Sequence, residues 1–179
     1  MLSQWAEEAG IPKGVFNVVH GLGAEAGQAI VEHPQIKAIS FTGGTATGAH
    51  IARTTASQFK KLSLELGGKN PAIIFADCDF DQALATTIRS SFANQGQICL
   101  CSSRILIEDS LYDRFKTALV EKVQRMQVGD PLEKETKMGA VVSEAHRDKI
   151  LLSIEKAKEA GGEILCGGSA ATPPNKRCT

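Results

Sequence analysis

Cys99 is the residue whose surroundings best suit a nucleophile. It follows Gln95-Gly96-Gln97-Ile98, just after the end of an expected helix, where a loop presents a thiol to a cleft. A nucleophilic cysteine has to be accessible and partly ionised. Composition alone favours another interpretation, a buried and inert thiol, because free cysteine is among the most buried residue types. Cys101 is the nearest rival for the role.

Glu65 is the candidate general base. It stands in Leu64-Glu65-Leu66, at the end of an expected strand that a parallel sheet would bury. A buried carboxyl group is rare unless it is paired or functional, and desolvation raises its pKa toward neutrality, which suits a general base. The alternative is an outward-facing residue at the edge of the sheet, and the sequence leaves both interpretations open.

Two glycine-rich turns follow expected strands and open expected helices. One is Gly21-x-Gly23-x-x-x-Gly27, and the other is Thr42-Gly43-Gly44. Such turns let the backbone approach a ligand, and the N-terminus of the following helix offers unpaired N–H groups to a pyrophosphate. The first spacing differs from Gly-x-Gly-x-x-Gly, so each turn is also compatible with a plain strand-to-helix connection. Two such turns on neighbouring units favour a phosphate-binding role more than either does alone.

The elements that position these residues alternate between strands and helices. Short apolar segments predict strands at residues 16–19, 37–41, 62–66, 71–75 and 104–107. Helices are predicted at about 24–32, 45–57 and 80–92, and from Ser110 and Ser143, with Asp79 as one N-cap. This order is typical of a parallel, doubly wound α/β sheet. The pattern restarts after Gly67-Gly68, which predicts a domain boundary there.

The composition is that of a globular chain without a charge bias. Of 179 residues, 42% are hydrophobic, and 20 Lys and Arg balance 20 Asp and Glu. This balance argues against a nucleic-acid partner, and no apolar run approaches the length needed to cross a membrane. The N-terminus lacks the pattern of a signal peptide. Five cysteines without a regular framework favour a reducing compartment, the cytoplasm, and their spacing predicts no metal site.

Three segments together resemble the motifs of the aldehyde dehydrogenase superfamily. Leu64-Glu65-Leu66-Gly67-Gly68-Lys69-Asn70-Pro71 is similar to its glutamate motif. Phe92-Ala93-Asn94-Gln95-Gly96-Gln97-Ile98-Cys99, followed by Arg104, is similar to its cysteine motif. Phe41-Thr42-Gly43-Gly44 resembles its cofactor turn. The motifs occur in family order with family-like spacing, and the likeness covers the interior of a family member, well under half of a complete chain.

The resemblance implies parts of two doubly wound, Rossmann-like domains, truncated at both ends. Residues 1–67 would be the C-terminal portion of an NAD-binding domain, and residues 68–179 the N-terminal portion of a catalytic domain. The implied cofactor is NAD, with NADP left open. The residues implied to lie near it are Thr42, Gly43, Gly44 and Leu66, with Gly21, Gly23 and Gly27 close to its phosphates. Gly44 stands where many family members carry a serine that touches a phosphate.

The resemblance also implies a reaction. Cys99 would attack the carbon of an aldehyde substrate, hydride would pass to the nicotinamide, and Glu65 would activate the water that releases the carboxylic acid. The backbone N–H of Cys99 would help to hold the oxyanion. A further likeness is to the branch of the family that oxidises semialdehydes such as 2-aminomuconate semialdehyde. A full-length form is expected to be a homo-oligomer.

Two other functions stay open. The first is a truncated, catalytically inactive binding subunit, because the family's oxyanion-hole asparagine and nicotinamide-ribose glutamate belong to segments outside these residues; the 179 residues alone are then expected to reduce NAD negligibly. The second is a thiol hydrolase that uses Cys99 without NAD. That class usually needs a histidine partner, and the four histidines are isolated in the sequence.

Overall fold

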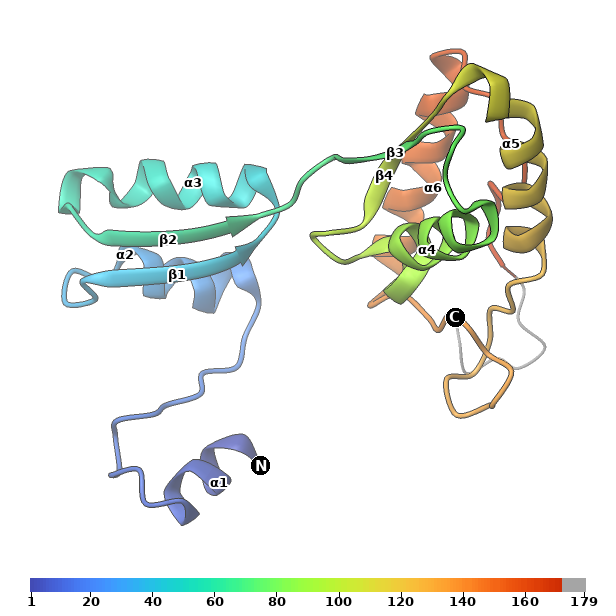
Figure 1. The fold of residues 1–179 in the computed structure, drawn as a ribbon. Coiled ribbons are helices and arrows are strands. Elements are labelled where there is room, and N and C mark those ends of the chain that lie inside the picture. Colours follow the sequence, from blue (N-terminus) through green and yellow to red (C-terminus); the bar gives the residue numbers. More distant parts are fainter. Residues whose placement is uncertain (172–179) are drawn as a thin grey trace. The chain divides into compact units, whose positions relative to one another are not determined.

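The structure, a computed structural model, describes residues 1–171 and divides the chain into two compact units, Met1–Gly67 and Gly68–Thr179 (Figure 1). The first unit contains α1 (Leu2–Glu8), η1 (Gly23–Gly27), α2 (Gln28–Glu32), β1 (Ala38–Gly43), α3 (Thr45–Thr55), η2 (Ala56–Gln58) and β2 (Lys61–Leu66). The second contains β3 (Asn70–Ile74), α4 (Phe80–Phe92), η3 (Ala93–Gly96), β4 (Ser102–Ile107), α5 (Asp109–Gln124) and α6 (Glu144–Glu159). Strand β1 pairs in parallel with β2, and β3 pairs in parallel with β4, which confirms the α/β class.

The core of the first unit lies between the strand pair and two helices. Val31 of α2, Ile39 of β1 and Ile51 of α3 are buried together. Phe41 and Leu64 pack against this cluster, so every second strand residue faces the helices, as the period of a strand requires. Side chains at the intervening positions point to the opposite face, where they are exposed and no helix of the first unit covers them. Figure 1 shows α3 running beside both strands.

The core of the second unit joins β3 and β4 to α4 and α5. Leu84, Leu111 and Phe115 are buried at its centre, and Phe115 meets the edge of Phe80 with ring centroids 5.7 Å apart. Helix α4 begins where the sequence predicts, because the Asp79 carboxylate accepts a hydrogen bond from the Gln82 N–H at 3.0 Å. The cap therefore fixes the start of the helix that leads to the cysteine motif.

The strand expected at residues 16–19 is wrong. These residues have no regular secondary structure, and Val19 is 67% exposed. Within residues 1–171 no strand pairs with this segment, and a strand is stable only when its backbone groups find partners. The short apolar run between glycines predicted a strand, but it could not show whether a neighbouring strand is present to pair with it.

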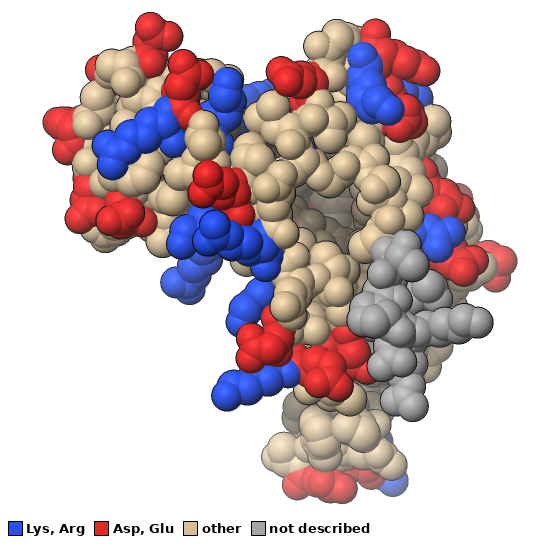
Figure 2. Space-filling model, turned by 90° about the vertical axis from the view of Figure 1, so that its right-hand side faces the viewer, with Lys and Arg blue, Asp and Glu red and all other residues tan. Residues whose placement is uncertain are grey.

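The surface carries charges of both signs. Figure 2 shows Lys and Arg residues interspersed with Asp and Glu residues over the visible face, in line with the balanced composition. In residues 1–171 no helix combines the length and apolarity that a membrane span requires. Over the same residues, no three His, Cys, Asp or Glu side chains gather as a metal site would need.

Candidate active site

Four predicted cofactor residues and Glu65 meet at one end of the first strand pair. The register places Thr42 opposite Glu65 and Gly43 opposite Leu66, at the carboxyl ends of β1 and β2. Thr42 and Glu65 therefore share the face that points away from α3, and both are exposed. The carboxyl ends of parallel strands are where open α/β sheets bind their ligands.

The structure shows Glu65 exposed rather than buried. Its neighbours Leu64 and Leu66 are half-buried on the helix side of β2, whereas Glu65 points to the opposite face and is exposed. Burial follows from which face of the sheet is covered, and the sequence pattern does not reveal that. Of the two interpretations of Glu65, the structure supports the outward-facing one, so desolvation gives no argument for its role as a base.

The N-terminus of α3 provides a site suited to an anion. Gly44 is the N-cap residue, with an extended backbone (φ −72°, ψ 145°). Its carbonyl accepts the first helical hydrogen bond, from the Gly48 N–H at 3.0 Å. The N–H groups of the first turn have no partner within the helix, and they point toward the carboxyl ends of the strands. Thr42, Gly43 and Gly44 are thus brought together as a turn that a phosphate could approach.

Gly44→Ser is expected to stabilise the first unit by a few tenths of a kcal/mol, because serine caps a helix better than glycine. Nothing lies within 4 Å of the position that a Cβ atom would take at Gly44. The matched control is Gly43→Ser, whose Cβ would lie 2.5 Å from Cζ of the packed Phe41 ring and should be destabilising. Urea unfolding followed by circular dichroism measures both. Loss of stability in Gly44→Ser would contradict the expectation.

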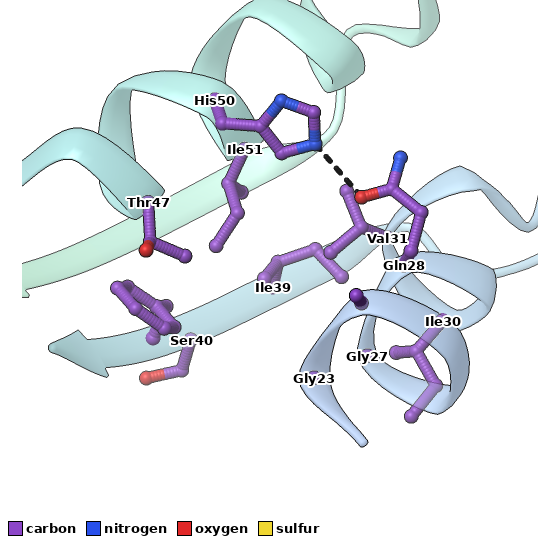
Figure 3. A pocket seen from close by; sticks show the side chains of 12 residues that line it. Gly23, Gly27, Gln28, Ile30, Val31, Ile39, Ser40, Thr47, His50 and Ile51 are labelled. Carbon is purple, nitrogen blue, oxygen red and sulfur yellow. Dashed lines mark hydrogen bonds between the residues drawn. The ribbon is translucent and has the colours of Figure 1, made fainter. Parts of the chain in front are cut away.

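A cavity of about 520 Å³ lies beside this turn, among η1, α2, β1 and α3 (Figure 3). Its apolar side is formed by the core residues Val31, Ile39 and Ile51. Gly23 and Gly27 also line it, and a Cβ atom at either would meet nothing within 4 Å. Backbone atoms without side chains therefore line the cavity at two of the three glycines of the Gly21-x-Gly23-x-x-x-Gly27 turn.

Gly21 has a different structural role. It does not belong to the cavity lining, and a Cβ atom there would lie 2.6 Å from the Cβ of Ala26. The absence of a side chain at Gly21 thus permits the tight approach of the chain before η1. Of the three glycines, Gly21 allows close packing, whereas Gly23 and Gly27 leave the cavity open.

Two polar residues at the cavity were not predicted from the sequence. The His50 ring on α3 makes a 2.8 Å hydrogen bond between Nε2 and the Gln28 Oε1 on α2, as the dashed line in Figure 3 shows. The Gln28 amide nitrogen donates to the Glu32 Oε1 at 2.6 Å. Since that contact directs the amide oxygen at His50, His50 donates through Nε2. The pair links α2 to α3, and its two residues lie 22 positions apart in the sequence, so local patterns cannot detect it.

Cys99 lies in the second unit, at the corner of an exposed turn. The turn is closed by the Cys101 N–H, which donates to the Ile98 carbonyl at 2.9 Å. Cys99 is exposed, whereas Cys101 is buried and its thiol faces the Ala93 carbonyl at 3.8 Å. Within residues 1–171 the Cys99 N–H has no hydrogen-bond partner. The structure thus separates the two rival cysteines and leaves Cys99 with a free backbone donor beside its thiol.

The segment before this turn has an unusual backbone. Asn94, Gln95 and Gly96 are all left-handed, with φ values of 50°, 56° and 73°. Left-handed conformations are unfavourable for residues other than glycine, and such strain often occurs at functional sites. A Cβ atom at Gly96 would also lie 3.1 Å from the Ser91 carbonyl oxygen. The run ends α4 and turns the chain abruptly toward Cys99.

Within the second unit, hydrogen bonds connect the end of the glutamate motif to the cysteine motif. The Asn70 side-chain amide donates to the carbonyls of Cys99 at 2.7 Å and Cys101 at 3.1 Å. The Arg104 guanidinium donates to the Lys69 carbonyl at 2.8 Å. These contacts bring the tail of one motif against the other, although about 30 residues separate them. Glu65 itself belongs to the first unit and Cys99 to the second.

Residues 1–178 match the model of the aldehyde dehydrogenase family. The chain belongs to this family. Among its relatives, 2-aminomuconic semialdehyde dehydrogenase of Danio rerio is 51% identical over 167 residues, which are 93% of this chain and 34% of that protein. The 2-aminomuconic 6-semialdehyde dehydrogenase of a Pseudomonas species is 48% identical over 169 residues, 94% of this chain and 34% of that protein.

Solved structures of the aldehyde dehydrogenase family share this fold. A crystal structure of betaine aldehyde dehydrogenase from Staphylococcus aureus in complex with NAD⁺ matches with a TM-score of 0.92 and 38% identity. The match covers 96% of this chain and 34% of that one. The chain thus spans about a third of the length of the relatives it matches.

Proposed function

We propose that this chain forms the central part of an NAD-dependent aldehyde dehydrogenase in which Cys99 is the nucleophile and Glu65 the general base. Residues 1–67 would belong to the NAD-binding domain and residues 68–179 to the catalytic domain, each part of a larger doubly wound sheet. The observation that carries the proposal is the turn at residues 98–101. It exposes one thiol of two, with a free N–H beside it, in a chain that belongs to this family.

The first unit has the chemistry that a dinucleotide needs. The cavity offers an apolar surface for a flat ring, and the adjoining N-terminus of α3 offers N–H groups to phosphate. The Staphylococcus aureus relative was crystallised with NAD⁺, which favours NAD for this chain. When bound, this cofactor supplies the acceptor for the hydride that leaves the substrate. NADP remains the second candidate.

Cys99 would perform the covalent part of the reaction. Its thiolate sulfur forms a bond to the aldehyde carbon, and the carbonyl oxygen becomes an oxyanion. The Cys99 N–H, unpaired within the described chain, would donate to that oxygen. Loss of hydride from the same carbon then leaves an acyl group bound to the sulfur as a thioester.

Glu65 would complete the reaction. Its carboxylate accepts a proton from water, the water oxygen attacks the thioester carbon, and the Cys99 thiolate leaves as the carboxylic acid is released. Exposure of Glu65 on the open face of β2 gives water access to it. The similarity to 2-aminomuconic semialdehyde dehydrogenases favours a semialdehyde as the substrate. We expect the full-length enzyme to be a homo-oligomer.

A chimaera tests this function directly. The matched 167-residue segment of this chain replaces its counterpart in the Danio rerio relative, so that the other two thirds of an enzyme are present. The chimaera is expected to produce NADH and carboxylic acid in equal amounts from an aldehyde, measured by NADH fluorescence and chromatography. Acid release from an ester without NADH would instead support the thiol hydrolase. A folded chimaera that binds NAD but turns nothing over would support the inactive binding subunit.

A further inference from the structure

Only one cysteine of the Cys99–Cys101 pair faces solvent, although the two are separated by a single residue. Cys99 is exposed at the corner of the turn, and Cys101 retains 8% of its surface exposure. The hydrogen bond from the Cys101 N–H to the Ile98 carbonyl closes the turn from within. This hydrogen bond does not hold the carbonyl groups of Cys99 and Cys101. Both carbonyl groups would rotate with the chain unless another group bound them.

Asn70 supplies that restraint from outside the turn. Its amide nitrogen carries two hydrogens, and it lies within hydrogen-bond distance of both carbonyl oxygens, 2.7 Å from Cys99 and 3.1 Å from Cys101. Asn70 is itself held, because it begins β3 and pairs with Ser102 of β4, the residue that follows the turn. Arg104 adds a second tie by donating to the carbonyl of Lys69, directly before Asn70.

We infer that Asn70 is a positioning residue that decides which of the two thiols is presented to substrate. The inference rests on the proposed role of Cys99 as the nucleophile. With both carbonyls held by one amide, the turn has a single arrangement in which Cys99 points outward and Cys101 packs below it. Without the amide, both carbonyls need water as their partner, so the turn opens more often and the Cys101 thiol becomes accessible.

Asn70→Asp tests the inference, because aspartate has the same shape but its carboxylate cannot donate. Cys78, Cys99 and Cys101 of the 179-residue chain are alkylated with iodoacetamide, and the rate at each is measured by peptide mass spectrometry. In the unmodified chain Cys99 should react fastest. In Asn70→Asp the ratio of the Cys99 rate to the Cys101 rate should fall by about tenfold or more, since two hydrogen bonds to the turn are lost. The rate at Cys78, half-buried in the same unit, should not change.

Asn17→Asp is the matched control. The Asn17 amide also donates to a backbone carbonyl, that of Gly14 at 2.8 Å, but it lies in the first unit. This variant should leave all three alkylation rates unchanged. A merely structural effect of Asn70→Asp would raise the rates at Cys78 and Cys101 together, whereas release of the turn raises Cys101 alone.

The outcomes separate the inference from the function on which it rests. An unchanged Cys99 to Cys101 ratio in Asn70→Asp overturns the role of Asn70 and leaves the nucleophile intact. A Cys99 rate no higher than that of Cys78 in the unmodified chain overturns the proposed nucleophile. If Asn70→Asp raises the Cys78 rate, a second variant, Asn70→Ser, decides, because serine keeps one hydrogen-bond donor. In that variant, a higher alkylation rate at Cys101 alone supports the inference. An unchanged rate at Cys101 overturns it.

Discussion

Cys99→Ser is expected to lower the aldehyde-dependent production of NADH by the Danio rerio chimaera by at least about 10³-fold. A serine hydroxyl is a poor nucleophile unless a neighbouring base removes its proton. His146, the histidine of the second unit, forms no hydrogen bond to Cys99 in the described residues, so it does not serve as that base. The covalent bond to the aldehyde carbon would therefore not form, and hydride transfer would have no intermediate to act on. Steady-state and single-turnover NADH fluorescence measure the loss.

Cys101→Ser is the matched control for this prediction. The same atom is exchanged two residues away, in the same turn, but at a buried thiol that faces the Ala93 carbonyl at 3.8 Å. Serine can donate to that carbonyl, so this variant should keep its activity within about tenfold of the parent, the range of a modest packing change. If activity disappears in Cys101→Ser and persists in Cys99→Ser, the nucleophile is Cys101 and not Cys99.

Phe115→Ala is expected to lower the free energy of unfolding of the second unit by about 3–5 kcal/mol. Phe115 is completely buried, with 0% of its surface exposed; beside Leu111 of the same helix, it packs α5 against Leu84 and the edge of Phe80. Without the ring, the chain buries less apolar surface when it folds. A cavity is also left where the helices meet the strands. A loss of this size is a large fraction of the stability of an ordinary domain.

Phe75→Ala provides the comparison within the same unit. Phe75 is 63% exposed after the end of β3, so the same substitution should cost at most about 1 kcal/mol. Urea unfolding monitored by far-ultraviolet circular dichroism gives both values for the 179-residue chain. Equal losses for the two variants would mean that Phe115 is not at the centre of the core described above.

Local sequence predicted much of the secondary structure because its signals act over a few residues. The Asp79 cap, the apolar spacing of α4 and the short apolar strands all lie within one turn or one strand of the groups that they control. The segment at residues 16–19 carried the same apolar signal and forms no strand. A strand depends on a partner far along the chain, and no local pattern reports whether that partner is present.

Membership of the aldehyde dehydrogenase family and the identity of Cys99 and Glu65 as candidates followed from the sequence alone, because motifs of this length preserve residue types in order. The tertiary structure decided which candidate thiol is exposed and on which face Glu65 lies. It also revealed Asn70, whose amide reaches a turn 29 residues away, and the Gln28–His50 pair at the cavity. Exposure and long-range hydrogen bonds arise when strands pair and helices cover one face of them. Those contacts join residues that are distant in sequence, and only the folded chain contains them.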